Sequence, residues 1–109
     1  MERLDIKEQD GNYVAKLNLP GIDKSKVEIS LAPEGRLTVN ADTSTENVDE
    51  KNEGYHIRER HSGSIQRQWS IPKGVKDEDI KASLQEGVLT IKYPNKSEDS
   101  NLARRIEID

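Results

Sequence analysis

The sequence contains no cysteine and no phenylalanine, and its aromatic content is only 4%. Without cysteine there is no disulfide, no thiolate nucleophile and no cysteine ligand for a metal. This composition fits a reducing compartment, so we expect a cytoplasmic protein. The single Trp and three Tyr are scattered along the chain, so they predict no stacking platform for nucleic-acid bases.

Long runs of like-charged residues and long runs of apolar residues are also absent. The formal net charge is −4 and the charges are interspersed, whereas nucleic-acid binding requires a basic stripe. No apolar run approaches the roughly 20 residues of a membrane helix, and the first residues do not resemble a signal peptide. A glycine-rich phosphate loop is absent, which argues against ATP-driven action. We therefore expect neither nucleic acid nor membrane as a partner.

Residues that could carry chemistry do not form a convincing site. His56 and His61 are five residues apart on a segment that alternates like a strand, which directs them to opposite faces and away from a shared metal. Ser62 and Ser64 beside His61 lack the other parts of a catalytic triad. The acidic run 77–79 lacks the full calcium-loop pattern. The sequence predicts no enzyme, no metal and no cofactor.

What the sequence does contain is a series of short alternating segments. In Tyr13–Leu19 and Val27–Leu31 every second residue is apolar, and Pro33-Glu34-Gly35 connects the latter to Leu37–Val39 as a hairpin. Further strands are predicted at 4–6, 55–60, 65–71, 80–84 and 88–93. About eight strands at a spacing of roughly 8–12 residues, without a convincing helix, indicate an all-β protein with an immunoglobulin-like antiparallel β-sandwich.

The segments between these strands are polar. Residues 42–54 contain one apolar side chain, Val48, and are predicted to form a long polar loop. Residues 72–79 form an acidic connector with room for one helical turn. At 109 residues and 31% hydrophobic content, the chain is one domain with a lean core, which favours self-association. We place this domain at residues 1–94 and a C-terminal extension, which begins with a polar tether, at 95–109.

Two features have no local explanation. Ile106 and Ile108 follow the tether and project to the same side of an extended chain, spaced to fill two adjacent pockets; an ordinary last strand or a frayed end is the alternative. Arg67 is in phase with Ile65 and Trp69, so its guanidinium points to the apolar side of a strand. Either its stem covers the core while its head reaches water, or it forms an ion pair across an interface.

Four motifs resemble those of one family. Ala82-Ser83-Leu84-Gln85-Glu86-Gly87-Val88-Leu89 resembles the small heat-shock protein signature Ala-x-x-x-n-Gly-Val-Leu. Leu19-Pro20-Gly21-Ile22 resembles that family's turn after its second strand. The segment Ile65–Pro72 is similar to its strand that carries an Arg and an aromatic residue, and Arg105–Ile108 resembles its tail motif, Ile-x-Ile. The motifs occur in the family's order over essentially the whole chain.

The resemblance implies an ATP-independent holdase that binds unfolded client proteins and assembles from homodimers into higher oligomers. It implies an alpha-crystallin domain whose strand Tyr55–Arg60 crosses to the partner subunit and pairs with Leu4–Lys7, giving a strand-swapped dimer. It also implies that the tail residues Ile106 and Ile108 insert into a groove that serves clients when vacant. The implied dimer-interface residues are Leu4, Ile6, Tyr55, Ile57, Arg58 and Arg67, and the implied groove residues are Val27, Ile29, Leu31, Ile80, Ala82 and Leu84.

The start of the chain departs from the family pattern. Family members carry a variable arm before this domain, often rich in Phe, whereas here the first predicted strand begins within a few residues of Met1. The expectation is a naturally short member or a truncated core, in either case without the usual arm. The main alternative is a co-chaperone or scaffold module of the p23 type, which shares the sandwich but lacks the exchanged strand and the tail motif.

Overall fold

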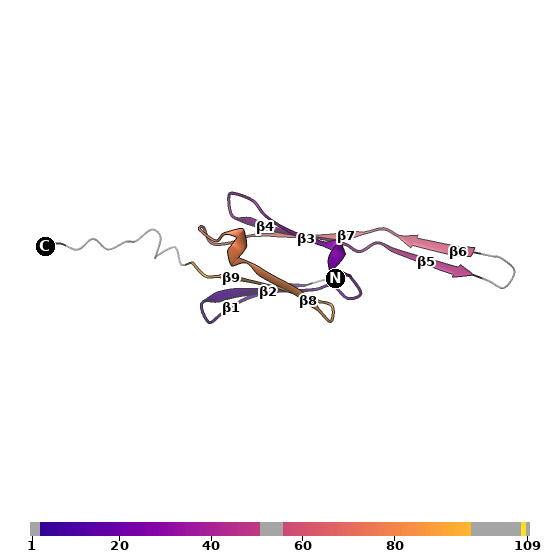
Figure 1. Ribbon diagram of the computed structural model, residues 1–109, viewed down its shortest axis with the longest axis horizontal. Coiled ribbons are helices and arrows are strands. Elements are labelled where there is room, and N and C mark those ends of the chain that lie inside the picture. Colours follow the sequence, from indigo (N-terminus) through magenta and orange to yellow (C-terminus); the bar gives the residue numbers. More distant parts are fainter. Residues whose placement is uncertain (1–2, 51–55, 97–107, 109) are drawn as a thin grey trace.

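The computed structural model describes residues 3–50, 56–96 and 108, with the backbone alone for 46–50 and 56–61. Two antiparallel sheets lie face to face and form a β-sandwich (Figure 1). The four-stranded sheet has the order β1-β2-β9-β8 and the three-stranded sheet the order β3-β4-β7. The strands of the first are β1 (Leu4–Gln9), β2 (Asn12–Asn18), β9 (Val88–Pro94) and β8 (Lys81–Gln85), and those of the second are β3 (Val27–Leu31), β4 (Arg36–Asp42) and β7 (Ser64–Ser70).

The core lies between the inner faces of the sheets and follows from the period of two in each strand. On β4 the burial alternates, with Leu37, Val39 and Ala41 buried and the residues between them partly open to solvent. The register of the central pair places Ala15 of β2 opposite Ile91 of β9. Eleven buried apolar residues form one cluster: Ala15, Leu17, Leu19, Leu37, Val39, Ala41, Ile71, Val75, Leu89, Ile91 and Tyr93.

The turn between β8 and β9 explains the glycine of the signature segment. Glu86 and Gly87 both have positive φ, 50° and 78°, as a tight turn between twisted strands requires. The carbonyl of Gly87 accepts a hydrogen bond from the backbone N–H of Leu19, 2.6 Å away. A Cβ atom on Gly87 would lie 3.1 Å from the Cα of Pro20. Gly87 therefore allows two segments far apart in sequence to approach closely.

The predicted polar loop 42–54 is partly wrong, because residues Thr45–Glu50 form strand β5, which pairs with β6 (His56–His61). The side chains of β5 show no alternation of apolar and polar residues, so they do not indicate a strand. Hydrogen bonding of its backbone to β6 stabilises the strand instead, since strand preference depends strongly on context. The β5–β6 hairpin projects from the end of the β3-β4-β7 sheet (Figure 1). At its base the N–H of Thr43 donates a hydrogen bond to the carbonyl of Gly63 at 3.0 Å.

The two remaining connectors contain single turns of 3₁₀ helix, η1 (Lys24–Lys26) and η2 (Asp77–Asp79). The second confirms the helical turn predicted within residues 72–79. Nine strands lie in the described part of the chain, one more than predicted, and the additional strand is β5. The predicted fold class, an all-β antiparallel sandwich, is confirmed.

Candidate functional site

The sandwich has an open side where strand β3 of one sheet meets strand β8 of the other. Both are the last strands of their sheets: β3 pairs with β4 and β8 pairs with β9. A groove of 370 Å³ lies there, and we call it the β3/β8 groove. Its lining combines apolar side chains from both strands with polar ones: Lys24, Val27, Ile29, Ala82, Ser83, Leu84, Gln85 and Leu89.

Four of the six residues predicted for this groove line it, namely Val27, Ile29, Ala82 and Leu84. The other two, Leu31 and Ile80, lie partly buried against the core and are not in the lining. Leu31 is the last residue of β3, and Ile80 directly precedes β8. Ala82 is exposed, so its small side chain leaves the middle of β8 open.

The structure adds groove residues that the sequence pattern does not indicate. Leu89 belongs to β9 and is buried, with 3% of its surface exposed, yet it contributes to the groove because β8 pairs with β9 and places Leu84 opposite it. Lys24 comes from η1 and adds a positive charge to a lining of apolar and polar side chains. Strand pairing is the missing information, since alternation alone does not show which strands are neighbours.

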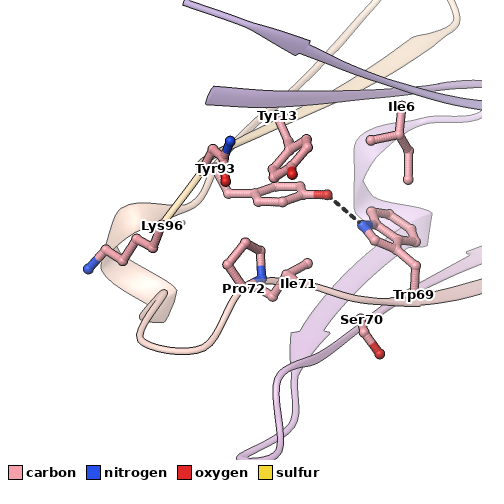
Figure 2. A pocket seen from close by; sticks show the side chains of 9 residues that line it. Ile6, Tyr13, Trp69, Ser70, Ile71, Pro72, Tyr93 and Lys96 are labelled. Carbon is pink, nitrogen blue, oxygen red and sulfur yellow. Dashed lines mark hydrogen bonds between the residues drawn. The ribbon is translucent and has the colours of Figure 1, made fainter. Parts of the chain in front are cut away.

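A second opening lies on the opposite side of the sandwich, between β1 and β7, and we call it the β1/β7 pocket. It has a volume of 660 Å³ and collects three of the four aromatic residues of the chain (Figure 2). The rings of Tyr13 and Tyr93 lie 5.5 Å apart between centroids and are tilted by 36°. The full lining is Ile6, Tyr13, Trp69, Ser70, Ile71, Pro72, Tyr93, Asn95 and Lys96.

A hydrogen bond spans this pocket from sheet to sheet. The indole Nε1 of Trp69 on β7 donates to the hydroxyl oxygen of Tyr93 on β9 at 2.9 Å (Figure 2). Burial raises the pKa of the Tyr93 phenol above its ordinary value, and this outweighs the opposite effect of the Trp69 hydrogen bond. The phenol is therefore neutral at physiological pH.

The described residues among those predicted for a dimer interface lie on three strands, β1, β6 and β7. Leu4 on β1 is half-buried against the core, whereas Ile6 on the same strand is 39% exposed and lines the β1/β7 pocket. Arg67 on β7 is half-buried and in phase with the half-buried Trp69, as the sequence predicts. One of its guanidinium nitrogens donates a hydrogen bond to the carbonyl of Gln66 at 2.9 Å.

The predicted exchanged strand is present as β6, which contains Ile57 and Arg58, whereas Tyr55 lies outside the described residues. Within one subunit β6 pairs with β5, and β1 pairs with β2. Of the two tail residues, Ile106 lies outside the described residues, and Ile108 is 96% exposed. Ile108 is therefore not seated in the groove of its own subunit.

In residues 3–50, 56–96 and 108 there is no group of three or more His, Cys, Asp or Glu residues that could hold a metal ion. Over the same residues, no helix is long and apolar enough to cross a membrane. Within the described residues, the β3/β8 groove and the β1/β7 pocket both open between the two sheets, beside the outer edges of their border strands.

These features define a class, an antiparallel β-sandwich with open sides between its sheets, and the comparisons place it in a family. The Hsp20/alpha crystallin family model matches residues 5–109. The chain is 35% identical over 106 residues both to small heat shock protein C2 of Rickettsia felis and to the 18.1 kDa class I heat shock protein of Arabidopsis thaliana. Each match covers 97% of this chain, but 66% and 65% of those proteins respectively.

A solved structure of a small heat-shock protein from Xylella fastidiosa matches all of this chain and 96% of that one, with a TM-score of 0.65 and 29% identity. The chain belongs to the Hsp20/alpha-crystallin family of small heat-shock proteins, which confirms the resemblance seen in its motifs. It spans about two thirds of the length of the curated relatives it matches.

Proposed function

We propose that this protein is an ATP-independent chaperone of the cytoplasm, a holdase that binds unfolding proteins and prevents their aggregation. The observation that carries this proposal is the β3/β8 groove, which contains apolar side chains of both strands and is bordered by the outer edges of those strands. Such an edge offers backbone N–H and C=O groups to an extended segment, while the groove accepts alternate side chains. Holding a client in this way follows mass action and consumes no fuel. No catalysis and no cofactor form part of the proposal.

The first level of assembly that we propose is a strand-swapped homodimer. The β5–β6 hairpin projects from the sandwich, so β6 can reach a second subunit (Figure 1). The outer edge of β1 is the natural acceptor, because β1 pairs with β2 on its other side. Each subunit would donate β6 to the β1 of its partner, which gives a closed twofold dimer. The interface would contain Leu4, Ile6, Tyr55, Ile57, Arg58 and Arg67.

The second level of assembly uses the tail. The end of β9 at Pro94 supports a division into an alpha-crystallin domain at 1–94 and a C-terminal extension at 95–109. We propose that Ile106 and Ile108 enter the β3/β8 groove of a neighbouring dimer. Burying both side chains contributes on the order of 3–6 kcal/mol before ordering costs. Tail and client would then compete for the groove, so assembly would regulate client binding.

The experiment for the holdase proposal is an aggregation assay with a heated or chemically reduced client, followed by light scattering in the absence of ATP. We expect the chain to delay scattering, and added ATP to leave the delay unchanged. The experiment for the dimer is a mass measurement at micromolar concentration. A dimer or an assembly built from dimers is expected for the wild type, with Arg67→Ala shifting it toward monomer. Client aggregation at the rate of a buffer control would contradict the holdase proposal, and a monomeric wild type would contradict the exchanged strand.

A further inference from the structure

The two residues that follow β9 are held at separate points on the sandwich. The backbone N–H of Asn95 donates a hydrogen bond to the carbonyl of Gly11, in the turn between β1 and β2, at 2.9 Å. The ammonium of Lys96 donates to the carbonyl of Gly74 at 3.1 Å. The same ammonium lies 3.8 Å from a carboxylate oxygen of Asp79. We call the contacts of Lys96 with Gly74 and Asp79 the Lys96 clamp.

The acceptor side of the clamp is well fixed. It belongs to the connector between β7 and β8, where Val75, the neighbour of Gly74, is 8% exposed and packs in the core. The Asp79 carboxylate is held within the connector, because the oxygen that faces Lys96 also accepts a hydrogen bond from the backbone N–H of Lys76 at 2.9 Å. Lys96 therefore meets acceptors that are already in position, and less ordering cost accompanies the contact.

The stem of Lys96 contributes to the fit. Gly74 has φ +89°, and a Cβ atom placed on it would lie 3.6 Å from the Cδ of Lys96. The methylene chain of Lys96 thus passes over a residue without a side chain on its way to the acceptors. The Lys96 side chain is 41% exposed and that of Asp79 is 32% exposed, so water and salt weaken the attraction without removing it.

We propose that Lys96 is a positioning residue, whose clamp fixes the direction in which the C-terminal extension leaves the sandwich and so selects the neighbouring groove that the tail motif reaches. This inference rests on the proposed tail-mediated assembly. A tether with a fixed origin and direction samples less space, which raises the effective concentration of the motif at grooves that lie on its path. Oligomers of uniform size follow from that restriction, because grooves in other directions are reached less often.

A direct test measures the direction of the extension when it is not docked. Because the chain has no cysteine, nitroxide labels attach only at introduced ones, here Ser30→Cys on β3 and Ser97→Cys just after the clamp. The background is Ile106→Ala with Ile108→Ala, and the labelled chain is diluted with unlabelled chain. With the clamp intact, electron–electron double resonance is expected to give a narrow distribution of distances between the labels.

Removing the ammonium while keeping the stem, with Lys96→Met, is expected to broaden this distribution, and Lys96→Arg to keep it narrow. Lys92→Met is the matched control, since it removes the charge of another lysine, which is exposed on β9 and is not part of the clamp. A distribution that Lys96→Met leaves unchanged would overturn the proposal. The distance distribution does not depend on assembly. Failure of the clamp can therefore be distinguished from failure of the proposed function.

The second test measures assembly with an intact tail. Lys96→Met is expected to widen the distribution of oligomer masses in native mass spectrometry and to accelerate subunit exchange roughly two- to fivefold, the effect of losing one partly exposed ion pair. High salt should reproduce part of this effect in the wild type. Identical masses and exchange rates in Lys96→Met and wild type would overturn the inference. If Ile106→Ala with Ile108→Ala also left assembly unchanged, the tail-in-groove model itself would be the part that fails.

Discussion

The hydrogen bond from Trp69 Nε1 to the Tyr93 hydroxyl, 2.9 Å long, connects the two sheets of the sandwich beside the β1/β7 pocket. Trp69 lies on β7, an edge strand of its sheet, and Tyr93 lies on β9, one of the two inner strands of the other sheet. The ring of Tyr13 lies beside the same phenol, tilted by 36° and 5.5 Å away between ring centroids. In a chain without phenylalanine, these three rings provide much of the bulk at this side of the core.

The first prediction concerns this bond. Tyr93→Phe keeps the ring but removes the acceptor, so the partly buried indole N–H loses its partner. We expect the free energy of unfolding to fall by about 1–2 kcal/mol in urea denaturation, with an unchanged m-value. Tyr13→Phe is the matched control, because it removes a hydroxyl from the neighbouring ring and leaves the Trp69 bond intact. An equal loss of unfolding free energy in both variants would show that the hydrogen bond between Trp69 and Tyr93 makes no specific contribution to stability.

The second prediction concerns alkaline pH. Burial raises the pKa of Tyr93 in the folded state, so its neutral form is favoured there. The corresponding stability is fully present below the ordinary tyrosine pKa of about 10, and it is lost as the pH rises above that value toward the folded pKa. We expect the free energy of unfolding to decline more steeply above this pH in wild type than in Tyr93→Phe. Parallel curves for the two proteins, measured by urea denaturation across the alkaline range, would contradict the assignment.

Much of the sandwich could be predicted from the sequence because burial on one face imposes a period of two. Val27–Leu31 was predicted with the bounds that β3 has, and the other predicted strands differ from the observed ones mainly at their ends. Strand β5 could not be predicted in this way, because its sequence, Thr-Glu-Asn-Val-Asp-Glu, has one apolar residue and no apolar face. Its pairing with β6 depends on tertiary context, which a local pattern does not contain.

The two openings show a second limit of the pattern. Alternation indicates which face of a strand is apolar, but it does not show which edges approach each other. The groove residues implied by the family resemblance include Leu31 and Ile80 but not Leu89, whereas the groove lining contains Leu89 and neither of the other two. The Trp69–Tyr93 bond joins residues 24 positions apart on different sheets, and no local spacing indicates it. The family resemblance implied that β3 and β8 border one groove. The residue patterns alone did not indicate this.

The third prediction tests the tail. Ile106→Ala combined with Ile108→Ala is expected to reduce the assembly to dimers in native mass spectrometry, because each Ile loses most of the apolar surface that it would bury in a groove. Glu107→Ala is the control, since in an extended chain its side chain points away from the two isoleucines. It should leave the mass distribution close to that of wild type. If the double variant retained the wild-type distribution, the tail would not be an assembly contact.

The fourth prediction separates the groove from the rest of the sandwich. Ala82 is exposed on β8 and lines the β3/β8 groove, so Ala82→Arg places a long charged side chain in the groove without disturbing the core. The positive charge of Lys24 lies in the same lining and opposes a second cation there. We expect loss of tail-dependent oligomers and a several-fold weaker delay of client aggregation, with the midpoint of urea unfolding nearly unchanged.

The control for this variant is Ser30→Arg, which adds the same side chain to β3 at an exposed position that is not part of the groove lining. Because both substitutions change the net charge equally, a general effect of charge on solubility would appear in both. An effect confined to Ala82→Arg would identify the groove as the working surface. Equal activity of the two variants would instead show that clients do not bind at β8. The β1/β7 pocket would then be the next surface to test, with the single Trp of the chain as a fluorescent reporter.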